Sequence, residues 1–517
     1  MKSVVSMLLV VCMLLGLLSG CGTQGESPYV PTGDGLSWDE DYTGPGATKP
    51  TEPESQSLTL TYYPDRSMNP YLCTDFTNRA LFALLYQSLF VVDRNYHVEP
   101  MLCSRYTVSD DMRTYTFYAE AATFSDGSVL TATDVATSLM AAKDGEFYKG
   151  RFLHVTNISL SADGGVIVEL DTPCVDLPIL LDVPIVKHTD VGVDTPMGTG
   201  PYILQSGAMG SWLTRRANWW CKAEMKVTAP SIALVNAQST TQIRDEFQFG
   251  ELDVVCADPG SDRYADYRCD YELWDCENGI FLYLACNMVS GVFSDPDVRS
   301  ALTYAINRDT LADNYYRGFA RSAVLPASPL SPYYNSMLAD KYDYDAAVFA
   351  EAVMAAGMQE KTVILLVNSD DSLRVRVARD IGKMLTEGGL VVEMKELGGS
   401  EYTYALRNRE YDIYLGQTKL SANMDLSAFF ASDGALSYGS INDVAMHTLC
   451  LESLANQGNY YTLHQRVMED GRLVPILFRS YAVYATRGLV TGLTPSRDNV
   501  FYYSLGKTME GVRDRSQ

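Results

Sequence analysis

The sequence lacks the residue patterns that mark the best-known hydrolytic and metal-dependent sites. It has no Gly-x-Ser-x-Gly segment, which excludes the nucleophile turn of the α/β-hydrolases, and no His-Glu-x-x-His segment. Only five histidines occur, and none lies four residues from another, so helical histidine pairs for a metal are absent. No Cys-x-x-Cys pair occurs either. We therefore expect a protein that is not an enzyme and has no cofactor and no metal site; a secreted hydrolase is the least favoured alternative.

Basic residues are also scarce. The chain has 40 Lys and Arg against 64 Asp and Glu, a formal net charge of −24. Proteins that bind nucleic acids need a basic surface, so this balance excludes nucleic acid as a partner. Hydrophobic residues make up 47% and charged residues 20%, which is typical of a globular protein. A chain of 517 residues exceeds one ordinary core, so we expect two or more domains.

The first 20 residues have the order of a secretory signal peptide. Lys2 is followed by an apolar run over residues 4–18, which is short for a membrane span of about 20 residues. Leu18-Ser19-Gly20-Cys21 then resembles a bacterial lipobox, which implies cleavage before Cys21 and a lipid on its thiol. Residues 21–56, rich in Gly, Pro, Ser and Thr, indicate a flexible linker. The resemblance places the protein on the extracytoplasmic face of a bacterial cell membrane.

Nine cysteines remain once Cys12 is removed with the signal peptide and Cys21 carries lipid. An odd number in an exported chain leaves at least one unpaired or intermolecular. Most are expected to be small buried apolar residues, and a disulfide between Cys269 and Cys276 stays open.

Periodicity in the remaining chain indicates an α/β protein. A strand is expected over residues 57–63 and an amphipathic helix over residues 78–90. Short alternating runs at 115–118 and 166–170 favour antiparallel strands. From about residue 286 helices alternate with strands, which indicates an α/β lobe. Helices are expected there over 297–312, 346–356 and 371–387, and strands over 362–367 and 390–394.

Four segments carry the most specific patterns. In residues 122–135, Asp126-Gly127 favours a tight turn, and Thr131 with Asp134 resembles a capping box. Residues 198–202 read Gly-Thr-Gly-Pro-Tyr, and residues 216–220 read Arg-Ala-Asn-Trp-Trp. The most specific segment is residues 293–308, in which Asp295-Pro296 starts a helix with a continuous apolar stripe.

Together these segments resemble solute-binding proteins of the oligopeptide, dipeptide and nickel ABC-transporter class, solute-binding family 5. The resemblance implies a two-lobed periplasmic-binding-protein-like fold of type II, with a hinge between lobes that close on a ligand. The implied organisation is lobe 1 over 57–285 with an inserted α+β subdomain at about 75–195, lobe 2 over 286–480, and a return to lobe 1 over 481–517. The chain is expected to cross between lobes near 284–288 and 478–485.

The ligand is less well defined. In peptide-binding relatives an Asp after a Trp supplies a carboxylate for the ligand's amino terminus. Here alignment of residues 416–430 puts Ala422 at that position, or Leu420 when counted from Gly416, and Gln417 stands in place of the Trp. A short peptide is therefore the default ligand, and a non-peptide solute or a metal complex is the alternative.

Six residues are candidates for contact with the ligand. Asp425 either anchors a ligand amine or caps the helix that starts near Leu426. Lys419 suits a ligand carboxylate or phosphate, or is a solvated surface lysine. Aromatic and polar side chains that lie in segments suited to line the cleft, or that simply pack, are Tyr71, Thr74, Trp274 and Tyr438.

The leading hypothesis is a monomeric, lipid-anchored receptor that captures a small solute and delivers it to an ABC permease in the membrane. Binding energy is used to close two lobes, and no bond is broken. A sensory lipoprotein without a permease is the alternative from another class.

Overall fold

The computed structural model describes residues 58–501, apart from 209, 222–228, 238, 262–263, 265 and 491–492. The signal peptide, Cys21 and the linker lie outside the described residues. Among the helices described, none combines the length and the apolarity that a bilayer crossing requires.

One eleven-stranded sheet runs through the described chain. Its strand order is β10-β11-β12-β1-β13-β19-β14-β18-β16-β17, and β15 pairs with β19. The strands on the β10 side are β1 (Leu58–Thr61), β10 (Tyr202–Gly207), β11 (Gly210–Arg215), β12 (Ser231–Val235) and β13 (Val254–Ala257). The others are β14 (Tyr271–Cys286), β15 (Ala320–Ser322), β16 (Thr362–Asn368), β17 (Val391–Leu397), β18 (Ile413–Lys419) and β19 (Leu473–Thr486).

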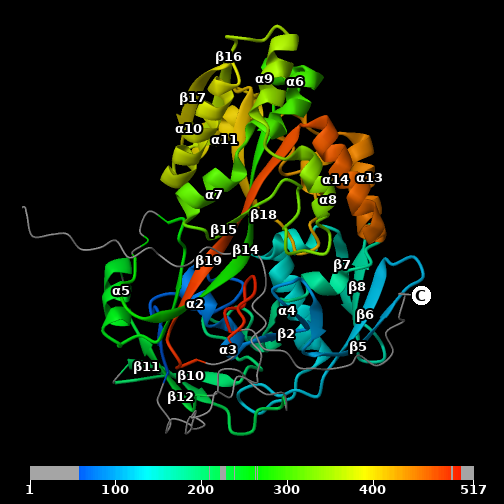
Figure 1. Cartoon of the computed structure of the whole chain (residues 1–517). Helices are drawn as coiled ribbons and strands as arrows, with labels where there is room; N and C mark the ends of the chain where they lie inside the picture. The colour runs from blue at the N-terminus through cyan, green and yellow to red at the C-terminus, as the bar shows by residue number, and fades with distance from the viewer. Residues whose placement is uncertain are drawn as a thin grey trace, which may run out of the picture. The chain divides into compact units, whose positions relative to one another are not determined.

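The antiparallel strands β14 and β19 belong to both halves of this sheet. The C-terminal part of β19 pairs with β13, from Val254 opposite Ala485 to Ala257 opposite Ala482. At the opposite end of the β14–β19 ladder, the C-terminal part of β14 pairs with β18, from Ile280 opposite Lys419 to Cys286 opposite Ile413. Figure 1 shows the two long strands crossing from the helices α6, α9 and α10 to the region of β10–β12. The fold is thus α/β with two lobes joined by two shared strands, as the sequence predicted.

The predicted lobe boundaries at 285/286 and 480/481 fall inside these two strands, and they stay predictions. The β14–β19 register shifts between Glu277 and Phe281, so the pairing is irregular where β18 joins the sheet. An irregular ladder at this point bends and twists the strands locally.

Lobe 2 follows the expected alternation of helices and strands. Strands β16 and β17 start within one residue of prediction but extend to Asn368 and Leu397, while α9 and α10 cover the expected ranges. Helices α10 and α11 contact β16 and β17, whereas α7 and α14 contact β19. The helices of this region are α6 (Pro296–Ala301), α7 (Arg308–Tyr316), α8 (Ser336–Ala339), α9 (Ala346–Ala355), α10 (Ser372–Glu387), α11 (Gly399–Asn408), α12 (Ser427–Phe430), α13 (Val444–Ala455) and α14 (Tyr460–Asp470).

The single helix predicted over 297–312 is wrong. After α6 the chain forms a 3₁₀ turn over Leu302–Ala305, and Ile306 then adopts an extended conformation. Asn307 starts a second helix, α7, by accepting a hydrogen bond from the Thr310 amide at 3.1 Å. The apolar stripe still faces the core, because Val298, Leu302 and Ile306 are fully buried.

The helix predicted over 78–90 is also wrong. Only α2 (Phe76–Ala80) and α3 (Phe82–Leu85) are helical, and β2 (Gln87–Ser88) and β3 (Phe90–Val92) follow. Strand β2 pairs with β9 (Pro184–Ile185), and β3 pairs with β4 (Val98–Pro100). Tertiary pairing therefore overrides the helical spacing of the leucines.

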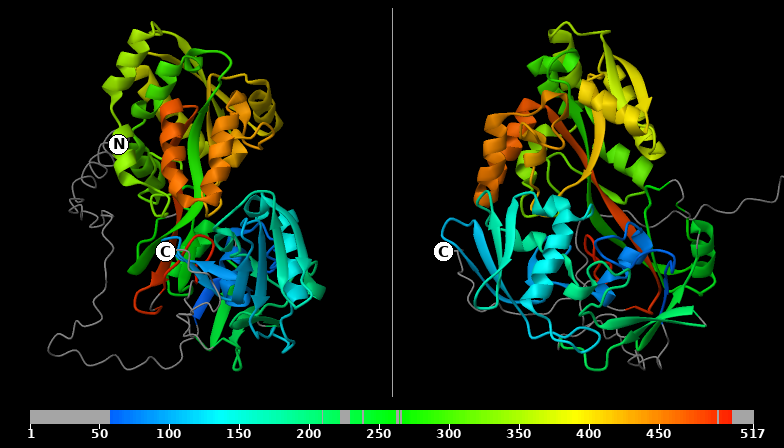
Figure 2. Two further views of the ribbon diagram at one scale, coloured as in Figure 1. Left: turned by 90° about the vertical axis from the view of Figure 1, so that its right-hand side faces the viewer. Right: turned by 180° about the vertical axis from the view of Figure 1, so that it is seen from behind.

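A separate four-stranded sheet confirms the predicted antiparallel strands of the inserted segment. Its order is β5-β6-β8-β7, with β5 (Cys103–Val108), β6 (Thr114–Ala119), β7 (Val155–Leu160) and β8 (Val166–Leu170). Helix α4 (Ala132–Asp144) lies beside this sheet, and both views of Figure 2 show the strands and the helix side by side. Helix α5 (Thr240–Gln248) lies elsewhere, next to β13.

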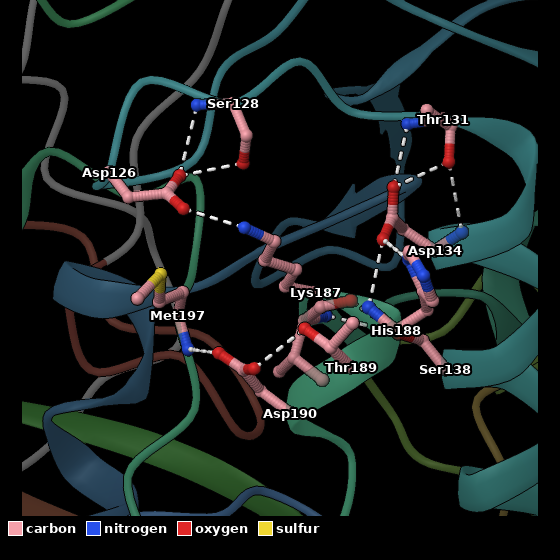
Figure 3. Close-up of polar contacts among 11 residues, drawn as sticks. Asp126, Ser128, Thr131, Asp134, Ser138, Lys187, His188, Thr189, Asp190 and Met197 are labelled. Atoms are coloured by element: carbon pink, nitrogen blue, oxygen red, sulfur yellow. Dashed lines mark hydrogen bonds and ion pairs between the residues drawn. The ribbon is translucent and has the colours of Figure 1, made fainter.

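The start of α4 explains the segment at residues 122–135. The Asp134 carboxylate accepts a hydrogen bond from the Thr131 amide (2.8 Å), and the Asp134 amide donates to the Thr131 hydroxyl oxygen (3.4 Å), as a capping box requires. The carboxylate also accepts from the Thr131 hydroxyl at 2.6 Å. It also accepts from the amide (2.8 Å) and Nδ1 (2.7 Å) of His188. Figure 3 shows these hydrogen bonds beside a second set, in which the Asp126 carboxylate accepts from the amide and hydroxyl of Ser128 and from Lys187 Nζ. The segment is therefore a scaffold that ties α4 to residues 187–190.

Replacing Asp134 tests this role. Because Asp134→Ala removes the cap and both His188 contacts, we expect it to lower the free energy of unfolding by about 2–4 kcal/mol. Urea unfolding followed by circular dichroism measures the change. Asp144→Ala, at an exposed position of the same helix, is the control and should stay within about 0.5 kcal/mol of wild type. Equal effects of the two changes would contradict the assigned role.

Candidate functional site

A cluster of charged side chains lies where the two lobes meet. Lys419 ends β18 of lobe 2, and Asp498 and Arg497 lie in the segment that follows β19. Arg151 comes from a 3₁₀ turn (Lys149–Phe152) of the inserted segment, and Glu277 comes from β14. We call Arg151, Glu277, Lys419, Arg497 and Asp498 the junction cluster.

Asp498 is the centre of the junction cluster. Its Oδ1 accepts a hydrogen bond from Lys419 Nζ, and its Oδ2 accepts from Arg151 Nη2 at 2.7 Å. Arg151 also donates to the Asp182 backbone carbonyl at 3.1 Å and forms an ion pair with the Asp182 carboxylate. One carboxylate therefore bridges a lysine and an arginine that belong to different parts of the fold.

Burial and charge oppose each other in this pair. Burial alone would raise the pKa of Asp498, but the charges of Lys419, Arg151 and Arg497 lower it overall. Burial, with Arg497 and Arg151 nearby, lowers the pKa of Lys419 to about 8 in spite of Asp498. The lysine is thus held in a position where its charge depends on the anion beside it.

Glu277 forms the second part of the junction cluster. Its carboxylate accepts hydrogen bonds from the Tyr96 hydroxyl at 2.5 Å and from the Ser328 hydroxyl at 2.8 Å. Arg497 donates to the Tyr96 oxygen and to the Leu420 carbonyl, each at 3.1 Å. Burial raises the pKa of Glu277. Because Tyr96 lies between β3 and β4 and Ser328 lies after β15, this carboxylate on β14 links two distant parts of the chain.

A second polar contact joins the inserted segment to lobe 2. His154 Nε2 lies 3.1 Å from Asp425 Oδ2, and His154 Nδ1 lies 3.0 Å from Asp171 Oδ1. With a carboxylate at each nitrogen, the ring donates to both only as an imidazolium. Burial alone would lower the pKa of His154, but Asp425 and Asp171 raise it overall.

Cavities of about 60 Å³ and 10 Å³ adjoin the junction cluster. The larger is lined by Asp498 together with Arg79, Gln87, Tyr148, Asp182 and Asn499. The smaller lies beside Glu277, Tyr96 and Arg497. Space next to buried charges is what a small polar ligand or ordered water requires.

Of the six ligand-contact candidates from the sequence, Lys419 is the one that the described contacts place in the junction cluster. Asp425 pairs with His154 and accepts a hydrogen bond from the Ser427 amide at 2.8 Å, but the N-cap residue of α12 is Leu426, so Asp425 does not occupy the cap position. Tyr71 is buried and donates to the Pro184 carbonyl at 2.6 Å, whereas Thr74 is exposed. Contact with a ligand stays a prediction for all of them.

The two remaining candidates lie in packing positions. Trp274 stands opposite Val483 in the β14–β19 ladder and packs against the main core. Tyr438, in a 3₁₀ turn (Tyr438–Ser440), approaches the Tyr414 ring with centroids 6.3 Å apart.

Sequence reasoning missed Arg151, Glu277, Arg497 and Asp498. Arg151 and Asp498 are 347 residues apart, and neither lies in a recognisable motif. The expectation that most cysteines are buried is confirmed, because seven of the nine described cysteines are buried. The disulfide that the sequence left open is not formed, since Cys269 and Cys276 are both free.

These features define a two-lobed α/β binding protein whose lobes share two strands and enclose paired charges. The model of the bacterial extracellular solute-binding proteins, family 5, matches residues 97–435, and the chain belongs to this family. The matched range contains all four segments from the sequence. The protein is therefore a solute-binding protein and not an enzyme, as predicted.

A known relative is similar in sequence, and solved structures share the fold. The chain is 24% identical over 390 residues to the glutathione-binding protein GsiB of Salmonella typhi, which covers 71% of this chain and 73% of that protein. NikA from Brucella suis in complex with Fe(III)-EDTA has a TM-score of 0.68 at 18% identity, covering 86% of this chain and 98% of NikA. The murein tripeptide binding protein MppA, in an unliganded open form, has a TM-score of 0.71 at 15% identity, covering 87% and 97%.

The His154–Asp425 contact predicts a dependence of stability on pH. The pKa of His154 is higher in the folded protein than in the unfolded chain, where it is about 6.5. The contribution of protonated His154 to the free energy of unfolding is therefore complete below pH 6.5 and is lost as the pH rises through the pKa of the folded protein. His154→Gln should therefore lower the free energy of unfolding by about 1.5–3 kcal/mol near pH 5.5 and by less near pH 8.5. Unfolding at both values measures this. His97→Gln, whose ring is exposed beside Asp93, is the control; a His154→Gln effect that does not change with pH would sink the assignment.

Proposed function

We propose that the protein is a monomeric lipoprotein, anchored through Cys21 on the extracytoplasmic face of the cell membrane, that delivers a small solute to an ABC permease. Membership of an extracellular solute-binding family supports the extracytoplasmic part of this proposal. The lipobox-like residues before Cys21 and the polar linker after it support the anchor. A tether keeps the binding protein at high local concentration near a membrane partner.

The observation that carries the proposal is the junction cluster. Charges from distant parts of the chain are largely shielded from water beside a cavity, at the level of the strands that the lobes share. A polar solute bound there would replace protein–protein ion pairs with protein–solute ones. The lobes would then close or open according to which set of contacts is stronger.

A short peptide is the proposed default ligand, and a metal complex is the alternative. Among the relatives, GsiB is named for glutathione, and AppA of Bacillus subtilis was solved with a nonapeptide; Brucella suis NikA was solved with a metal chelate. Ala422, at the position where peptide-binding relatives have an Asp, is buried at 4% exposure. An amine anchor at that position is therefore missing, and other groups must hold a peptide. A sensory lipoprotein without a permease would use the same site.

Ligand capture is tested by stabilisation. A solute at 100 times its dissociation constant should stabilise the purified protein by about 2.7 kcal/mol, and thermal unfolding against short peptides and metal chelates identifies the class. Lys419→Met should weaken the response, while Lys383→Met, on the exposed face of α10, should not. A folded protein that no peptide, chelate or other small metabolite stabilises would contradict solute capture.

The lipid anchor is tested by fractionation. Cys21→Ser removes the thiol that carries the lipid. Because burial of the acyl chains in the bilayer is what holds a lipidated protein on the membrane, we expect this variant to move from the membrane fraction to the soluble extracytoplasmic fraction. Cys12→Ser, within the apolar run, is the matched control and should leave the protein on the membrane. Retention of Cys21→Ser on the membrane after residues 1–20 have been removed, as mass spectrometry shows, would rule out this anchor.

A further inference from the structure

The cations of the junction cluster form a binding site for a carboxylate group, and in this structure the carboxylate of Asp498 occupies it. Asp498 presents one carboxylate to Lys419 on one oxygen and to Arg151 on the other. Its side chain is 17% exposed, and it lies in the segment that follows the last strand of the sheet. Lysine and arginine from different elements thus converge on a single carboxylate group.

Arg79 supplies a third cation beside the same space. It lines the 60 Å³ cavity together with Asp498 and is buried at 9% exposure. Its described hydrogen bonds go to neutral groups: the carbonyls of Pro70 and Cys73 and the Tyr148 hydroxyl. A buried guanidinium whose described hydrogen-bond partners are all neutral favours an anion in the adjoining cavity.

The Phe147 ring connects Arg79 to Lys419. The Arg79 guanidinium carbon lies 3.1 Å and Lys419 Nζ lies 4.4 Å from the centre of this ring. The two cations therefore adjoin one aromatic side chain, and Asp498 both lines the cavity and accepts a hydrogen bond from Lys419.

We propose that Arg79, Arg151 and Lys419 bind a carboxylate of the solute, and that Asp498 occupies this site until the solute displaces it. This rests on the proposed function and adds the class of solute. An amine would instead have to displace Lys419 from Asp498. That exchange would leave Lys419, whose side chain is only 28% exposed, beside Arg151 and Arg497 without an anion, which is unfavourable. A carboxylate leaves every cation paired.

Chemical rescue tests the site without knowledge of the solute. Asp498→Ala leaves the three cations and a space of about one carboxylate, so acetate should raise the unfolding temperature of this variant and not that of the wild type. Sodium chloride at equal ionic strength is the salt control. Asp380→Ala is the matched variant, because its lysine partner, Lys383, is 74% exposed and is solvated by water, so acetate should not rescue it. Adding Lys419→Met to Asp498→Ala should remove the acetate effect.

Three results would overturn the site: no acetate effect on Asp498→Ala, an equal effect on Asp380→Ala, or stabilisation by methylammonium in place of acetate. The last would identify an amine site. If Asp498→Ala does not fold, Asp498→Ser replaces it, because it leaves nearly the same space. The same acetate effect on the unfolding temperature is then expected of Asp498→Ser.

Peptide probes test the displacement itself. Trialanine should bind Asp498→Asn about tenfold or more tightly than it binds the wild type, because the competing carboxylate is gone, whereas the C-terminal amide of trialanine should show no such gain. Equal gains for both probes would contradict displacement. Wild type that binds no probe or library solute would count against the proposed function, while the acetate result would still decide the site.

Discussion

The pairing of β14 with β19 is the constraint on which the rest of the structure depends. These strands are the only described pair that is hydrogen-bonded to strands of both lobes, β13 on one side and β18 on the other. The strands of both lobes are therefore attached to the same pair of strands, and a change in the twist of that pair moves one lobe relative to the other. The irregular register after Glu277 lies beside the pairing of Ile280 with Lys419. The irregular part of the ladder is thus next to the charges of the junction cluster.

Position on this ladder also explains why the buried charges are tolerated. Lys419 and Glu277 are fixed by strands, so their partners are presented at constant geometry, and each described charge of the junction cluster has an ion pair or a charge-assisted hydrogen bond. A buried ion pair adds little stability by itself, because desolvation opposes the attraction. Such pairs are suited to exchange, since a ligand group of the same charge can replace one member at a small net change in free energy.

Local patterns predicted the fold well where local forces decide it. The capping box at Thr131–Asp134 and the cap at Asp295 were visible in the sequence, and so were the α/β alternation and the buried stripe from Val298. Predictions were wrong where tertiary contacts override spacing, as in the pairing of Gln87 with Ile185 that ends a helix. In the site, Lys419 was found because it lies in a family-like segment. Arg151 and Asp498 were not, because their pairing depends on two distant loops meeting, which no local pattern records.

The most direct test is a crystal structure of the protein with the solute that copurifies with it from the cell. We expect the solute between the lobes, with a carboxylate within hydrogen-bond distance of Lys419 and Arg151, and with Asp498 turned away from both. A solute bound elsewhere, or bound while Asp498 keeps its contacts with Lys419 and Arg151, would contradict this account.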